Sequence, residues 1–179
     1  ANLNNLNNLY LSNTHVSNSD VSLLANLTNL TNLHLNDNQI SNISSLANLT
    51  KLTVLWLQNN PLNAAAYTTV IPALQARGVT VTFDPNTAPV ANAQEVTVDQ
   101  GGTKVIILSG SDPDGKSLTY SIVTQPSNGA LSGTAPNLTY TPTNADFVGS
   151  DSFTFKANDG TFDSAEATVT ITVAENKAP

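Results

Sequence analysis

The feature of this sequence that most limits how it can fold is a leucine pattern that recurs in the first half of the chain. Six of its positions match over three copies, which are spaced 24 and then 22 residues apart. The copies are Leu3, Leu6, Leu9, Leu11, Thr14 and Val16; Leu27, Leu30, Leu33, Leu35, Asn38 and Ile40; and Leu49, Leu52, Leu55, Leu57, Asn60 and Leu62. One copy is too short to bury its own leucines, so neighbouring copies must stack. The pattern therefore predicts a solenoid with a parallel sheet on one face.

The dense leucines resemble the short leucine-rich repeat of bacterial internalin-type proteins. Each copy supplies a short strand, such as Leu33-His34-Leu35, whose leucines point into the coil. Asn38 and Asn60 follow their strands where the chain bends, and we expect their amides to bond backbone groups inside the bend. Thr14 takes this place in the first copy, where its hydroxyl can satisfy fewer groups.

After residue 62 the leucine pattern gives way to a different one. Residues 63–77 are rich in alanine and predict a helix with Asn63 as its N-cap and Gly78 as its stop. Pro72 should kink or divide this helix. Residues 79–83 alternate like a half-buried strand. The pair resembles the C-terminal cap of bacterial leucine-rich repeat proteins, and because no such cap precedes Leu3, we expect further repeats upstream.

The second half of the chain consists of alternating runs that favour short strands. Gly-containing turns separate these runs, including Asp114-Gly115, Asn128-Gly129 and Asp159-Gly160, and no helical period is present. This pattern predicts a small antiparallel sandwich. The expected fold class is therefore mixed, with a leucine-rich repeat solenoid and its short helical cap followed by an all-β sandwich of immunoglobulin or cadherin type.

Charge and a repeated linker indicate where the two domains meet. Residues 1–86 carry two basic and three acidic side chains, a net charge of −1, whereas residues 87–179 carry four and ten, a net charge of −6. The motif Asn-x-Ala-Pro occurs at 86–89 and again at 176–179, a spacing of 90 residues. We therefore place leucine-rich repeats with a C-terminal cap at 1–86, a sandwich at 87–175 and the start of the next linker at 176–179.

The turns of the second half carry a recognisable set of motifs. These are Gly110-Ser111-Asp112-Pro113-Asp114-Gly115, Leu118-Thr119-Tyr120, Asp151-Ser152-Phe153-Thr154-Phe155 and Asn158-Asp159-Gly160. Together they resemble the tandem cadherin-like and immunoglobulin-like domains of bacterial surface adhesins. The resemblance implies an extended array that holds a binding module away from the cell, often with calcium. Lys116 stands where members of this family commonly have a further acidic residue.

Three aspartates on two of these turns are candidate metal ligands. The loop of Asp112 and Asp114 and the loop of Asp159 should emerge at the same end of a seven-stranded sandwich. Calcium prefers six to eight oxygen ligands, which clustered aspartates provide. The sequence therefore predicts a possible Ca²⁺ site at Asp112, Asp114 and Asp159. The alternative is that these are ordinary turns whose carboxylates bond the local backbone.

A second candidate site lies on the strands of the repeats. Alignment of the copies places Tyr10, His34 and Trp56 at one equivalent position that faces solvent on the concave side. The polar neighbours expected to join them in ligand binding are Asn32, Asn36 and Gln58. Tyr and Trp are enriched in binding hot spots. The alternative is a cross-strand aromatic ladder that only stiffens the sheet.

Composition restricts the function further. The chain has no cysteine and only two histidines, which are not at metal-ligand spacing, so no catalytic constellation is present and we expect no enzyme. No basic stripe exists to bind nucleic acid, and no apolar run is long enough to insert into a membrane. We therefore expect a secreted or surface-anchored bacterial adhesion module whose concave face binds a protein or glycan. The alternative is a structural spacer, with the true binding module upstream.

Overall fold

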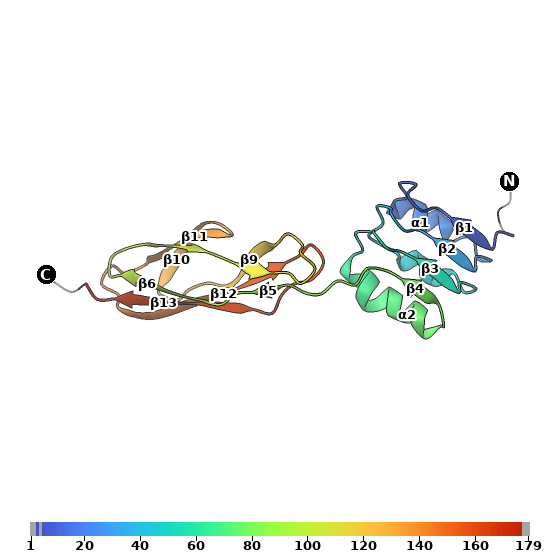
Figure 1. Ribbon diagram of the computed structural model, residues 1–179. Helices are drawn as coiled ribbons and strands as arrows, with labels where there is room; N and C mark the ends of the chain where they lie inside the picture. The colour runs from blue at the N-terminus through green and yellow to red at the C-terminus, as the bar shows by residue number, and fades with distance from the viewer. Residues whose placement is uncertain (1–2, 4, 177–179) are drawn as a thin grey trace. The chain divides into compact units, whose positions relative to one another are not determined.

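The computed structural model describes residue 3 and residues 5–176, which divide into two compact units between Asn86 and Thr87 (Figure 1). Of the second linker expected at 176–179, only Asn176 is among the described residues, and its amide donates to the Gln100 carbonyl (3.0 Å). No helix in the described part of the chain is long and apolar enough to cross a membrane.

The first unit is built on a parallel sheet of four short strands, one for each copy and one for the cap. The strands lie in chain order: β1 (Asn8–Tyr10), β2 (Asn32–His34), β3 (Val54–Trp56) and β4 (Thr80–Thr82). Neighbouring strands pair without a slip in register, so that Leu9, Leu33 and Leu55 lie side by side. The leucine period therefore determines which residues meet across the sheet.

The segments that return from one strand to the next differ between the copies. The first copy forms α1 (Asn18–Leu24), where the Ser17 N–H donates to the Asp20 carboxylate (2.9 Å). The second forms only a 3₁₀ turn, η1 (Ser44–Asn48). The two extra residues of the first copy are accommodated here, away from the sheet, which explains why the strand register is undisturbed.

The leucines form one continuous core whose burial increases along the unit. Leu33, Leu35 and Leu55 are fully buried, whereas Leu6, Leu9 and Leu11 are only partly buried and Leu3 is 55% exposed. Each coil covers its neighbour, and within the described residues the first coil packs against the second.

The two asparagines satisfy the inside of the bends, as the sequence predicts. The Asn38 amide donates to the carbonyls of Leu11 and Leu35 (2.7 and 2.9 Å), and its oxygen accepts the N–H groups of Thr14 and Val16 (3.1 and 2.9 Å). Each asparagine thus bonds its own coil and the coil before it, because Asn60 likewise donates to the carbonyls of Leu35 and Leu57. The Thr14 hydroxyl donates only to Leu11 of its own coil (2.7 Å).

The cap contains one continuous helix with a π-helical segment followed by an α-helical segment. Asn63 caps it by accepting the Ala66 N–H (3.0 Å), a π-helical segment η2 (Ala66–Val70) follows, and α2 (Ile71–Ala76) completes it. The π-helical segment ends just before Pro72, which has no N–H to donate, and the Ile71 N–H reaches back five residues to the Ala66 carbonyl. Pro72 therefore changes the hydrogen-bond pattern of the helix.

Gly78 ends the cap helix in the way expected. It has a positive φ of 85°, a conformation that glycine adopts without a steric penalty. Its N–H donates to the Gln75 carbonyl, and the Val79 N–H donates to that of Leu74, which together satisfy the last turn. The chain then enters β4, which extends the sheet by one strand.

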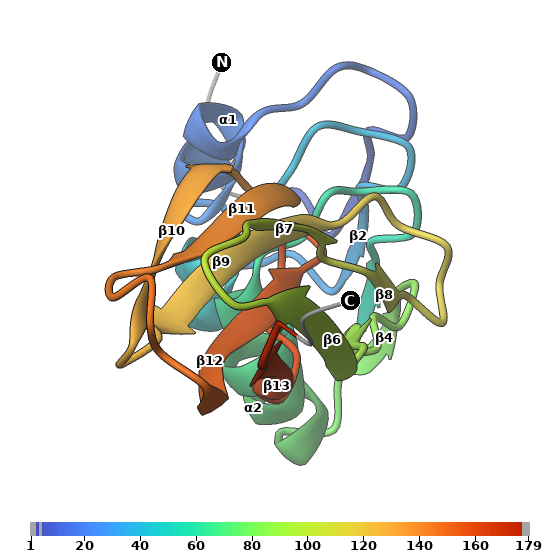
Figure 2. The same ribbon diagram turned by 90° about the vertical axis from the view of Figure 1, so that its left-hand side faces the viewer.

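The second unit is a sandwich of two sheets, which Figure 2 shows with β10, β11 and β7 on one side and β12, β13 and β6 on the other. One sheet has the order β10 (Gly129–Thr134), β11 (Asn137–Pro142), β7 (Lys104–Ile107). The other has the order β6 (Gln94–Asp99), β13 (Ala167–Ala174), β12 (Gly149–Asn158), β9 (Thr119–Thr124). A short pair, β5 (Val90–Ala91) and β8 (Gly110–Ser111), completes it.

One strand pair departs from the antiparallel arrangement that the sequence predicts. β6 pairs with β13 in parallel, with Val96 opposite Ile171. The chain first pairs with β8 as β5. It then enters the four-stranded sheet as β6, where it runs in the same direction as the last strand, β13. Turn signals reveal hairpins between consecutive strands, but they carry no information about a pair formed by the first and last strands.

A buried carboxylate lies inside the sandwich. Asp151 is 6% exposed and accepts the Tyr140 hydroxyl (2.9 Å) and the N–H groups of Ser127, Asn128 and Ser152. Burial by itself raises the pKa of Asp151, but these hydrogen bonds to the charged form more than offset it, and the pKa is lowered. Burial also raises the pKa of Tyr140 well above its usual value. The network ties the start of β10 to both sheets.

Candidate binding surface

The outer face of the first unit's sheet carries a column of rings. We call this surface the ladder face; it is formed by the strand residues that alternate with the buried leucines and by their continuation beyond the strands: Asn8, Tyr10, Ser12, Asn32, His34, Asn36, Val54, Trp56, Gln58, Thr80, Thr82 and Asp84. Tyr10, His34 and Trp56 lie in register on β1, β2 and β3, as expected.

The three rings contact one another in sequence. The rings of His34 and Trp56 stack, with centroids 4.0 Å apart and planes at 15°, whereas Tyr10 meets His34 at 84° with centroids 4.6 Å apart. The outer rings remain in water, since Tyr10 is 63% and Trp56 is 40% exposed. The ladder that the sequence analysis offered as an alternative therefore exists, and it leaves two aromatic side chains accessible.

The amides predicted beside the rings are half-buried and partly engaged. Asn36 accepts the Ser12 hydroxyl (2.6 Å) and donates to the Asp37 carboxylate (2.6 Å), and Asn32 accepts the Thr53 hydroxyl (3.3 Å). The Gln58 Oε1 is buried and makes no hydrogen bond within the described residues. These side chains border the ring column with both donors and acceptors.

The sequence pattern did not identify two acidic residues here: Asp84, which belongs to the ladder face, and Asp37, which follows Asn36 of that face. Asp84 lies 26 residues after Gln58, the same offset that separates β3 from β4, so it continues the row of Ser12, Asn36 and Gln58. Its carboxylate accepts the Asn59 N–H. Asp37 accepts the Asn59 side-chain amide (2.7 Å), so both carboxylates lie around one residue. The 26-residue offset is the signal that identifies Asp84, once the cap strand is aligned with the repeats.

The carboxylates of the predicted calcium ligands accept backbone hydrogen bonds, and that of Asp114 accepts the Thr87 N–H (2.6 Å). Asp112 accepts the N–H groups of Asp114 and Lys116 (2.9 and 3.0 Å), and Asp159 accepts those of Thr161 and Phe162 (2.7 and 2.6 Å). Within the described ranges, no group of three or more His, Cys, Asp or Glu side chains is arranged to hold a metal ion. The structure therefore does not bring the three aspartates together as a ligand set, and the calcium site stays a prediction.

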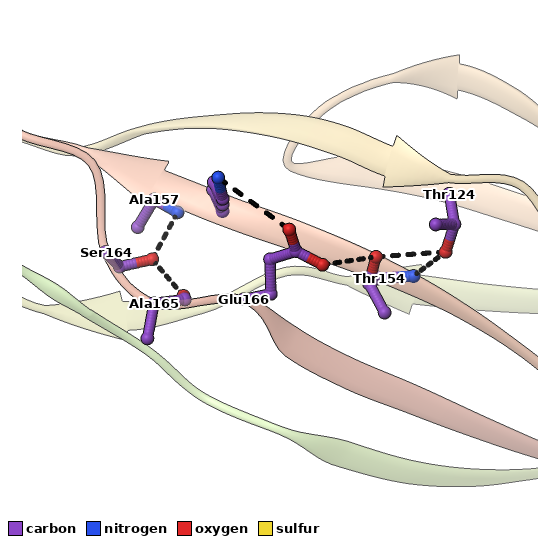
Figure 3. Close-up of polar contacts among 7 residues, drawn as sticks. Thr124, Thr154, Ala157, Ser164, Ala165 and Glu166 are labelled. Atoms are coloured by element: carbon purple, nitrogen blue, oxygen red, sulfur yellow. Dashed lines mark hydrogen bonds and ion pairs between the residues drawn. The ribbon is translucent and has the colours of Figure 1, made fainter.

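The second unit has a polar cluster on the exposed face of its larger sheet (Figure 3). Glu166 accepts the Thr154 hydroxyl (3.3 Å) and pairs with Lys156 (3.7 Å), and the hydroxyls of Thr124 and Thr154 are 2.9 Å apart. The cluster spans the register shift that follows Thr154 in the pairing of β9 and β12. Exposed ion pairs contribute little to stability. We therefore interpret this cluster as one that bridges the irregular pairing of β9 and β12.

Two family models match the chain. Residues 28–67 match the model of leucine-rich repeats in two copies, and residues 86–172 match that of the bacterial Ig domain. The chain therefore contains a segment similar to leucine-rich repeats, followed by a segment similar to the bacterial Ig domain. This agrees with the order of leucine-rich repeats and immunoglobulin-like domain that the sequence motifs indicate. No curated protein matches the chain in sequence.

Several solved structures are similar to parts of the chain. An internalin of Listeria monocytogenes is 24% identical over 45% of this chain and 28% of its own, with a TM-score of 0.35. An internalin-like protein of the same organism is 17% identical over 94% and 57%, with a TM-score of 0.36. An endo-fucoidan hydrolase of glycoside hydrolase family 107 is 24% identical over 55% and 16%, with a TM-score of 0.37. The chain thus spans between 16% and 57% of the length of these proteins.

Proposed function

We propose that this chain is a non-enzymatic adhesion module of a secreted or surface-anchored bacterial protein, and that its ladder face binds a protein or glycan ligand. The observation that carries this proposal is the exposure of Tyr10 and Trp56 beside polar side chains. Aromatic side chains offer a large apolar area at low entropic cost, and their burial by a partner is favourable. The sheet of a leucine-rich repeat solenoid is a habitual binding surface.

The surface is suited to a ligand that lies across it. No enclosed pocket is present in the described residues, and no catalytic step is proposed. The three rings follow neighbouring strands, which are about 4.8 Å apart, so the column spans roughly 10 Å. A ligand of this size is a protein side-chain cluster or a sugar rather than a small cofactor.

The second unit is proposed to act as a carrier for this surface. Its family is one of bacterial Ig domains, and its net charge of −6 favours solubility and self-repulsion. In the alternative function the whole chain is a spacer and the binding module lies elsewhere in the protein. The exposed Trp56 favours binding over the spacer, because a spacer gains nothing from an indole in water.

The test is a screen of protein and glycan arrays with the wild-type chain and with Trp56→Ala. We expect Trp56→Ala to weaken binding of any captured ligand by about 2 kcal/mol. Leu23→Ala is the matched control, since Leu23 is 68% exposed on α1 and outside the ladder face. A ligand whose affinity is the same for the wild type and both variants would contradict the proposal and favour the spacer.

A further inference from the structure

The ladder face carries two negative charges on one border. Asp84 belongs to the face, and Asp37 directly follows Asn36. Both are exposed, and both accept hydrogen bonds from Asn59, whose amide groups carry no net charge. Among the described residues the one ion pair is that of Lys156 and Glu166 in the second unit, so neither aspartate is neutralised by a basic side chain.

The two basic side chains of the first unit are engaged elsewhere. The Lys51 ammonium donates to the Asn29 side chain (2.6 Å). The Arg77 guanidinium donates to the carbonyls of Ala47 and Leu49 (both 2.7 Å). Neither lies on the ladder face, so the charge that this face presents to a partner is negative.

Within the described residues, the ring contact of Trp56 is with His34, on one face of the indole. His34 stacks on it from β2, and since the ring planes are nearly parallel across the strands, the opposite face of the indole points toward β4. There the residue in register is Thr82, which is exposed and too short to cover an indole. Asp84 follows two residues later on the same side of the chain.

The Asp84 carboxylate occupies a defined position in this arrangement. Along the sheet, the Asp37 N–H donates to the Gln58 carbonyl, and one strand further the Asn59 N–H donates to the Asp84 side chain instead of a backbone oxygen. The carboxylate is therefore held at the border of the sheet, two residues beyond Thr82, the residue that pairs with Trp56. An aromatic face together with a carboxylate held in place can recognise a planar cation.

We infer that the ligand of the ladder face is a protein segment with an exposed arginine, whose guanidinium stacks on Trp56 over Thr82 and donates hydrogen bonds to Asp84. This inference rests on the proposed binding function and specifies its partner. Arginine fits better than lysine because its planar group can stack and form a forked hydrogen bond at the same time. A neutral sugar could donate hydroxyl hydrogen bonds to the two carboxylates, but it would leave their negative charges without a counter-charge.

Trp56 is the only tryptophan in the chain, so its fluorescence reports this position directly. The probes are a short capped peptide with one arginine and the same peptide with citrulline, which keeps the shape but removes the charge. Both are titrated to tens of millimolar. We expect a saturable change with the arginine peptide, affinity about fivefold weaker for citrulline, and weaker binding at high salt.

Two variants and one control test the role of the carboxylate. Asp84→Asn keeps an oxygen that can accept the Asn59 N–H, and should weaken binding of the arginine peptide about threefold or more. Thr82→Leu covers the open indole face without a change in charge, and should also weaken it. Asp99→Asn removes the same charge from an exposed site in the second unit and should have no effect.

The outcomes separate this inference from the proposed function. Equal binding of the two peptides, or no response to either, overturns the arginine inference. So does an affinity for the arginine peptide that is the same in the wild type, in Asp84→Asn and in Thr82→Leu. A neutral glycan captured on the array and lost in Trp56→Ala would overturn it as well, yet would leave the binding function intact. If no array ligand depends on Trp56 and the peptides also fail, both proposals are contradicted.

Discussion

The two units satisfy the polar groups of their interiors in opposite ways. In the first unit neutral amides do so: Asn38 is 8% exposed and both donates and accepts hydrogen bonds. In the second unit a carboxylate does so: Asp151 only accepts, from the Tyr140 hydroxyl and from backbone N–H groups. An amide suits a bend that exposes both carbonyls and N–H groups, whereas a carboxylate suits a turn with several donors. From this difference we expect the second interior to respond to pH more strongly than the first.

The largest effect should come from a carboxylate in the first interior. Asn38→Asp leaves the carbonyls of Leu11 and Leu35 without a donor and places a charge in a site 8% exposed. We expect a loss of roughly 4 kcal/mol in the free energy of unfolding. Trp56 fluorescence during urea unfolding measures it. Asn26→Ala, at an exposed amide that donates to the Leu23 carbonyl, is the control and should change little. A much smaller loss in the free energy of unfolding would show that water replaces the amide as the donor to the carbonyls of Leu11 and Leu35.

The reciprocal change in the second interior should be smaller. Asp151→Asn keeps one acceptor but turns the other oxygen into a donor, which then faces the donors of Tyr140 and Asn128. We expect a loss of about 2 kcal/mol, measured by amide exchange in β12. The strands of the first unit should keep their protection, and a uniform loss in both units would contradict the independence of the two interiors.

Acid should therefore weaken the second unit before the first. The pKa of Asp151 is lower in the folded chain than its usual value of 3.8. The stability it contributes is complete above that value and is lost as the pH falls through the folded pKa. In the first unit, hydrogen bonds from Ser17 lower the pKa of Asp20, but Asp20 is exposed on α1 and contributes little. Amide exchange from pH 6 to pH 2 should show β12 opening first in the wild type and a flatter profile in Asp151→Asn.

The smallest expected effect concerns calcium. If the loops of Asp112, Asp114 and Asp159 rearrange around Ca²⁺, the second unit alone should gain about 1 kcal/mol at a calcium concentration about five times Kd. Calorimetric titration and the melting temperature of the wild type and of Asp114→Asn measure it. An absence of both heat and a thermal shift at millimolar calcium would leave these carboxylates with the backbone hydrogen bonds that they make now.

The sequence predicts a structure best where its chemistry is local. The repeat period identifies the core leucines and the ring column, because each copy repeats the same local pattern. Asn63, Pro72 and Gly78 mark the cap helix, because each of these residues acts on neighbours within one turn. The parallel pairing of β6 with β13 was missed, since it joins strands from opposite ends of the unit. Asp84 was missed because it belongs to the cap, whose sequence no longer follows the leucine pattern.

The unequal copies of the first unit also bear on how such a protein can change over time. The spacings of 24, 22 and 26 residues between successive strands leave the alignment of Tyr10, His34, Trp56 and Thr82 untouched. Differences in length are absorbed by α1, η1 and the cap helix, on the far side of the coil from the sheet. Insertions and deletions there are tolerated without moving the rings, so the back of the coil can diverge in length while selection acts on the ladder face one residue at a time.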